Sequence, residues 1–194
     1  MTDHAATLRL AVLPRSGLLT DALLALGGAA FIGLLAQISY QPSFTPVPYT
    51  MQTFGVLLVG AAYGLRLGAV TSSLYVLLGI VGVPLYADEK HGWDVFKGAT
   101  GGYLVGFILA AALTGWLAER GWDKRFATSV TMMLTGNVVI YACGATWLHH
   151  YLHASWNTTL TDGVYYFLPG DLVKLYLAAA ALPGAWKLAQ RIRS

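Results

Sequence analysis

Residues 167–183 read FLPGDLVKLYLAAAALP, an apolar stretch with Asp171 and Lys174 near its beginning. The apolar run predicts a buried or membrane-embedded helix, and Pro169 and Gly170 suit a sharp start to it. Residues three apart share one face of a helix, so the carboxylate and the ammonium should lie close together. Charges in an apolar helix are costly and usually face the bundle interior or a wet cavity. The surroundings of this helix therefore decide both the fold and the role of the pair.

The composition of the whole chain indicates an integral membrane protein. Of its 194 residues, 56% are hydrophobic and only 11% are charged, against about 25% charged in an ordinary soluble domain. The pI of about 9.0 would suit a nucleic acid partner. The Lys and Arg residues, however, recur between apolar runs and form no single patch, so we expect a lipid bilayer around the chain and no nucleic acid partner.

Six apolar stretches are candidate membrane helices, and we expect an all-α fold, a compact six-helix transmembrane bundle. We treat residues 1–194 as one domain with a short N-terminal segment, residues 1–17. A membrane helix needs about 20 apolar residues, and the second stretch is short by that measure. The expected helices cover residues 18–39, 50–64, 67–82, 100–118, 127–148 and 168–187.

The positive charges predict the orientation of the bundle. With six spans, both termini lie on one side, which holds nine Lys or Arg residues; the other side holds two, Lys90 and Lys97. Short cytoplasmic loops carry an excess of Lys and Arg. We therefore predict a multi-pass protein of the cell membrane with both termini in the cytoplasm.

The pair in the last helix has two interpretations. Asp171 and Lys174 form either a structural salt bridge, with snorkelling of the lysine, or the polar floor of a ligand site with donors and acceptors. The segment TPVPYTMQT, residues 45–53, is similarly open: it is either an ordinary rigid loop or part of a site. Thr50 suits the N-cap of the second helix, where free N–H groups attract an anion, and Gln52 adds polar reach.

Missing motifs bear on function. The chain has no G-x-x-x-x-G-K-[ST], G-x-S-x-G or H-E-x-x-H, so we expect no ATP hydrolysis by this chain and no enzyme activity. His149, His150 and His153 have helical spacing, but no carboxylate or cysteine pattern supports them, so we expect no metal site and no cofactor. Small residues at four-residue spacing, Gly102, Gly106 and Ala110, indicate close helix packing. The similar stripe Ala25, Ala29 and Gly33 in the first helix either packs internally or offers a flat face to another membrane protein.

Four segments together resemble the BioY family, the biotin-binding S components of energy-coupling factor (ECF) transporters. They are TPVPYTMQTFGVLLVGAAYGLRLGA (45–69), YVLLGIVGVPLY (75–86), GATGGYLVGF (98–107) and FLPGDLVKLYLAA (167–179). The resemblance implies a six-helix membrane bundle that binds biotin from outside. It also implies a transmembrane coupling protein and two ATPase subunits as partners, and these ATPases would supply the missing nucleotide motif.

The resemblance also implies roles for single residues. Asp171 would accept from the N–H groups of the biotin ureido ring, and Lys174 would meet its carbonyl or the ligand carboxylate. Thr50 and Gln52 belong to a loop that would close over the ligand, and Tyr103 would form a wall of the pocket.

The resemblance also implies a docking role for two alanines and a ligand contact from a loop, and the sequence departs from the family pattern at two places. Ala25 and Ala29 match the Ala-x-x-x-Ala face that docks the coupling protein in related S components. Ala99 stands where the family commonly has proline, and the loop ADEKHGWDVFK, residues 87–97, is more charged than usual. Asp88 is the nearest candidate for a polar contact from that loop.

The leading hypothesis is high-affinity biotin binding and uptake by an S component of an ATP-driven vitamin importer. The alternatives are an S component for another small vitamin, a polytopic membrane enzyme using Asp171, Lys174 and the histidines, and an accessory membrane subunit without a ligand. Binding of one vitamin over others, or measurable turnover, separates these classes.

Overall fold

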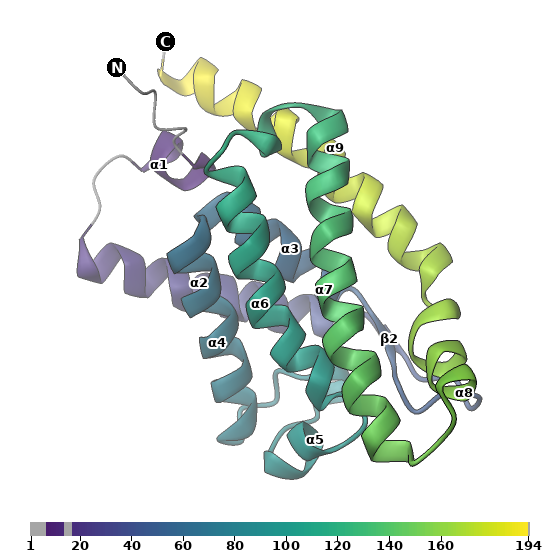
Figure 1. Ribbon diagram of the computed structural model, residues 1–194. Coiled ribbons are helices and arrows are strands. Elements are labelled where there is room, and N and C mark those ends of the chain that lie inside the picture. The colour runs from purple at the N-terminus through teal and green to yellow at the C-terminus, as the bar shows by residue number, and fades with distance from the viewer. Residues whose placement is uncertain (1–6, 14–16, 194) are drawn as a thin grey trace.

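The computed structural model describes residues 7–13 and 17–193 and is mostly helical (Figure 1). The longer helices are α2 (Leu18–Ala36), α3 (Gln52–Tyr63), α4 (Leu65–Ile80), α6 (Gly101–Ala118), α7 (Phe126–Leu152) and α9 (Leu168–Arg193). The short elements are α1 (Leu8–Val12), β1 (Ser39–Tyr40), β2 (Tyr49–Thr50), η1 (Ala87–Glu89), α5 (Trp93–Lys97), η2 (Trp122–Lys124), α8 (Trp156–Leu160) and the π-helical turn η3 (Thr161–Tyr165).

Four helical stretches in the described residues are long and apolar enough to cross a membrane. They are Leu18–Ala36, Gly101–Ala118, Phe126–Leu152 and the continuous run Trp156–Arg191. The two remaining long helices, α3 and α4, have 12 and 16 residues. At 1.5 Å per residue, a 12-residue helix covers about 18 Å, well short of a hydrocarbon core of about 30 Å. Length alone thus marks four helices as spans.

Helix α6 lies at the centre of the bundle and packs directly on α3, α4 and α7. Its close contact with α7 depends on small residues: a Cβ on Gly102 would lie 2.2 Å from Cβ of Trp147 and 2.6 Å from the carbonyl oxygen of Cys143. A Cβ on Gly106 would lie 3.0 Å from Cα of Ile140. The predicted packing role of this small-residue stripe is therefore confirmed for its two glycines.

Helix α2 is the least covered of these stretches. Leu18, Leu19 and Leu23 are exposed, whereas the opposite face of the helix packs against α4 and α3. Exposed leucines are expected where a helix meets lipid. The helix ends at Ala36 and not near residue 39 because the chain turns into the β1–β2 hairpin, in which Ser39 pairs with Thr50.

The C-terminal end of α9 lies at the same end of the molecule as α1 (Figure 1). There Ala11 of α1 packs with Trp186 and Ala189 of α9. The indole Nε1–H of Trp186 also donates to Oδ2 of Asp123 in η2 at 2.5 Å. The opposite end carries β2, α5 and α8 (Figure 1), which are short ordered elements in segments expected to be loops.

Candidate functional site

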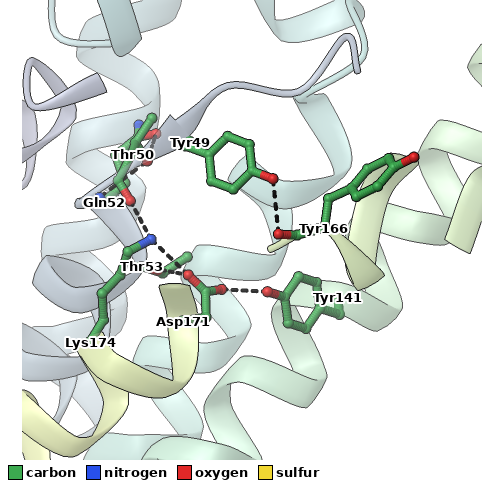
Figure 2. A network of polar contacts seen from close by, with 8 residues as sticks. All are labelled: Tyr49, Thr50, Gln52, Thr53, Tyr141, Tyr166, Asp171 and Lys174. Carbon is green, nitrogen blue, oxygen red and sulfur yellow. Dashed lines mark hydrogen bonds and ion pairs between the residues drawn. The ribbon is translucent and has the colours of Figure 1, made fainter. Parts of the chain in front are cut away.

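Asp171 lies at the centre of a polar network near the beginning of α9, at the end of the bundle that carries the hairpin (Figure 2). Its side chain is only 6% exposed. Oδ1 accepts from Nζ of Lys174 at 2.7 Å and from the hydroxyl of Thr53 at 3.5 Å. Oδ2 accepts from the hydroxyl of Tyr141 on α7. Side chains from α3, α7 and α9 thus donate to one carboxylate. These hydrogen bonds stabilise a charge that would be costly to bury alone.

Lys174 connects this carboxylate to the hairpin. Its Nζ donates to the backbone carbonyl of Thr50 at 2.6 Å as well as to Asp171, and its side chain is 15% exposed. The spacing of three residues on one helix brings the two charges together, as predicted. An ammonium has three donors, and a carboxylate can accept about four hydrogen bonds. The ion pair therefore keeps the capacity to bind a further polar group.

Thr50 and Gln52 lie beside the pair at the start of α3. Met51 is the N-cap residue of α3, not Thr50 as predicted, although the hydroxyl of Thr50 accepts from the backbone N–H of Gln52 at 3.2 Å. That hydroxyl also donates to Oε1 of Gln52 at 2.9 Å, while Nε2 donates to the hydroxyl of Tyr75. The Gln52 amide is thereby fixed in orientation on both sides.

Tyr103 forms part of the wall, in the first turn of α6. Its hydroxyl donates to the carbonyl of Gly163 in η3 at 2.7 Å. The ring lies close to α7, since a Cβ on Gly144 would approach Cε1 of Tyr103 to 2.3 Å. The tyrosine is buried and held at both its ring and its hydroxyl.

A cavity of about 250 Å³ lies over this network. Such a volume is slightly below that of most ligand pockets, which are usually about 300–1,000 Å³. Its polar lining comes from Thr50, Gln52, Thr53, Lys90, Thr100, Tyr103, Tyr141, Asp171 and Lys174. Its apolar lining includes Pro48, Val95, Leu104, Phe107, Ile140 and Phe167. The cavity combines an apolar body with a few fixed donors and acceptors of both charge signs.

The structure does not bring Asp88 into the lining of this cavity. Its neighbours Ala87 and Lys90 line the cavity instead. Asp88 has a left-handed backbone with φ of 57°, and its carboxylate accepts from the hydroxyl of Ser39 at 2.5 Å and faces Lys90 at 3.4 Å. The Ser39 hydrogen bond lowers the pKa of Asp88, so this carboxylate is held charged beside the hairpin.

Ala25 and Ala29, the predicted docking face, are covered by the chain itself. Ala25 is 4% exposed and Ala29 is fully buried. They lie on the face of α2 that packs inward, whereas its leucines point outward. Ala29 therefore offers no open surface in this conformation, whereas Ala25 borders a cavity between α1 and the start of α2.

Of the three histidines, His149 and His150 meet edge to face, with ring centroids 5.8 Å apart. His149 stacks on Trp156 with ring centroids 4.0 Å apart, and His153 ends α7 with a left-handed φ of 50°. Within residues 7–13 and 17–193, no group of three or more His, Cys, Asp or Glu side chains is placed to hold a metal ion.

Several residues of the site were not predicted from the sequence. Tyr141, Lys90 and Phe167 line the cavity, and Phe167 stacks on Tyr49 with ring centroids 4.4 Å apart. The hydroxyl of Tyr49 donates to the carbonyl of Tyr166 at 2.9 Å, which joins the hairpin to the segment before α9. These residues are polar or aromatic and lie near the expected external end of a helix or in an external loop. Many other residues of the chain share that property, so it does not single them out.

Comparisons with known proteins place the chain beside a group of transporters. The sequence model of a family described as "BioY family" matches residues 5–191. A protein of Thermotoga maritima named "Biotin transporter BioY" is 40% identical over 134 residues, covering 69% of this chain and 78% of the relative. A protein of Rhizobium etli with the same name is 35% identical over 155 residues, covering 76% of this chain and 81% of the relative.

A solved structure shares the fold. It is described as the crystal structure of the S-component for biotin from an ECF-type ABC transporter, and it aligns with a TM-score of 0.78. The alignment covers 87% of this chain and 92% of the other, at 24% sequence identity. At that identity the likeness establishes the architecture of the bundle.

Proposed function

Because this chain belongs to the BioY family, we propose that it binds biotin with high affinity and takes it up as the S component of an ATP-driven ECF-type importer. The observation that carries the proposal is the Asp171–Lys174 pair, which lies in a cavity with an otherwise largely apolar lining. The relatives are named biotin transporters, and the chemistry of biotin matches this cavity.

The ureido ring of biotin is the part that suits the ion pair. It carries two N–H donors, which suit the Asp171 carboxylate, and one carbonyl, which suits the Lys174 ammonium. The two side chains present these complementary groups only 2.7 Å apart, so a small planar ring could address both at once. The thiophane ring and the aliphatic chain would lie against Tyr103, Phe107 and Phe167.

The carboxylate of biotin suits a second cation, and Lys90 is the other ammonium in the cavity lining. It comes from the loop after η1, so it can approach the end of the ligand away from the α9 pair. Asp88 would then orient this loop through Ser39 and Lys90 without touching the ligand. In the same way, Thr50 and Gln52 would shape the site from the hairpin and α3.

We further propose that the chain is a single membrane domain with six spans and both termini in the cytoplasm. The four long helices give at least four spans. The short helices α3 and α4, a hairpin joined at Gly64, would add the other two. The distribution of Lys and Arg supports this orientation. Short spans buried against neighbours need not match the full thickness of the bilayer.

We propose that the chain does not act as an enzyme and depends on a transmembrane coupling protein and two ATPase subunits. The absence of a nucleotide-binding motif in the sequence supports this dependence. Docking through Ala25 and Ala29 would require α2 to separate from the helices that now cover these alanines. Such a movement is compatible with the weak coverage of α2 by the rest of the bundle.

Calorimetry with biotin on the purified chain tests the proposal. Asp171→Asn and Lys174→Ala each remove a charged hydrogen-bonding partner, worth about 1.5–3 kcal/mol, so biotin should bind about 10–150-fold more weakly. Asp94→Asn and Lys97→Ala are matched controls at exposed positions of α5 that do not line the cavity, and they should leave the affinity unchanged. Equal binding of thiamine or riboflavin by the parent chain would contradict the biotin assignment, and unchanged affinity in Asp171→Asn would contradict the site.

A further inference from the structure

A second cavity lies at the opposite end of the bundle, between α1, the start of α2 and the α3–α4 junction. Its volume is about 840 Å³, more than three times that of the cavity beside Asp171. Apolar walls come from Leu10, Leu18, Ala22, Leu67 and Val70. Leu18 is 90% exposed, so these walls continue into the outer face of α2, where lipid is expected.

The polar lining of this cavity includes a buried arginine with an unsatisfied donor. The side chain of Arg9 is only 9% exposed, and its terminal Nη2 is paired with Oδ1 of Asp21. Its Nε is buried and has no hydrogen-bond partner within residues 7–13 and 17–193. A buried donor without an acceptor is unfavourable. A guanidinium is suited to two parallel hydrogen bonds with a phosphate group, so an anionic oxygen acceptor is the group that Arg9 lacks.

The other charged side chains of the cavity indicate which further charge the ligand carries besides this anionic acceptor. Arg66 lines the same cavity, and its side chain has no hydrogen-bond or ion-pair partner among the described residues. Asp21 and Glu119 also line it, so two cations face two carboxylates. Glu119 uses Oε1 to accept from the backbone N–H of Leu65 at 2.9 Å, and a carboxylate keeps further acceptor positions. Such a balanced lining suits a zwitterion better than a simple anion.

We propose that this cavity binds the headgroup of a zwitterionic phospholipid with a primary ammonium, that is, a phosphatidylethanolamine. The phosphate diester would accept from Arg9 and Arg66, and the ammonium would donate to Glu119 or Asp21. The acyl chains would lie along Leu18, Leu67 and Val70. The proposed topology puts this end at the cytoplasmic surface of the membrane, the level at which headgroups of that leaflet lie.

Native mass spectrometry on the delipidated, detergent-purified chain tests the proposal. We expect retention of phosphatidylethanolamine at about 10-fold lower lipid concentration than phosphatidylcholine, whose quaternary ammonium has no N–H donor. Arg66→Gln should weaken retention of phosphatidylethanolamine about 10-fold, while Arg125→Gln, an exposed arginine that does not line the cavity, should leave it unchanged. Val70→Trp, which fills the cavity from its apolar wall, should weaken retention in the same way and is independent of charge.

Several outcomes would overturn the proposal. Equal retention of both lipids, stronger retention of phosphatidylglycerol, or equal loss in Arg66→Gln and Arg125→Gln would each exclude a site of this chemistry. Displacement of the lipid by millimolar inorganic phosphate would show that a free anion is the occupant. Unchanged lipid retention together with lost assembly with the coupling protein in Arg66→Gln would identify the cavity as a protein-docking surface.

Discussion

The hydroxyl of Tyr141 donates to Oδ2 of Asp171 from a different helix. We expect Tyr141→Phe to weaken biotin binding about 10-fold, equivalent to about 1.4 kcal/mol, because the buried carboxylate then loses a donor that fixes its orientation. Calorimetry measures the effect. Tyr151→Phe removes a hydroxyl from an exposed tyrosine on the same helix and should have no effect. Unchanged or tighter binding in Tyr141→Phe would show that this hydroxyl does not position the acid.

At this scale the spacing of residues was informative where the contact is local, whereas Tyr103 was named through the family resemblance. The Asp171–Lys174 pair was predicted because both residues lie on one helix at a spacing of three, and the ion pair is confirmed. Tyr141 and Lys90 line the same cavity but are distant in sequence from Asp171 and Lys174. Only the packing of α7 and of the loop after η1 brings them there. Asp88 was predicted from its loop, but its left-handed backbone directs the carboxylate to Ser39.

Among the elements, the contact between α6 and α7 gives a sharp prediction. Gly102→Ala should lower stability by about 1–3 kcal/mol, because its Cβ would lie 2.2 Å from Cβ of Trp147 and the helices would have to separate. Thermal melting in detergent measures the change. Gly27→Ala is the matched control, since a Cβ at Gly27 in α2 meets nothing within 4 Å. Equal melting temperatures for the two variants would contradict the close-packing interpretation.

The long elements were predictable because apolar length is a strong signal, and each expected helix has a counterpart in the structure. The boundaries differ where local backbone geometry decides. Helix α7 continues to Leu152, beyond the expected residue 148, until His153 adopts a left-handed conformation. The hairpin β1–β2 was missed because its two-residue strands have no periodicity to detect. The family resemblance found in four motifs is confirmed by the match over residues 5–191.

For the whole molecule, orientation in the membrane is the testable property. The chain has one cysteine, Cys143, so Cys143→Ser gives a background for single-cysteine labelling. In intact cells, a membrane-impermeant maleimide should label Asn157→Cys, which lies at the end of the bundle with the proposed biotin site. It should label Arg125→Cys only after permeabilisation, because Arg125 precedes α7 at the opposite end. The reverse pattern would invert the topology, and labelling of both from outside would show that α7, the helix between these two positions, does not cross the membrane.

The ammonium of Lys174 belongs at once to the floor of the cavity and to the hairpin, through its 2.6 Å bond to the carbonyl of Thr50. A ligand that takes this donor removes an anchor of the hairpin, and a hairpin that swings away frees the donor for the ligand. The two events are thermodynamically linked, so each shifts the equilibrium of the other by the same free energy. A ligand that competes for this N–H therefore loosens the hairpin, whereas a ligand that uses only the third N–H of the ammonium leaves the bond to Thr50 in place.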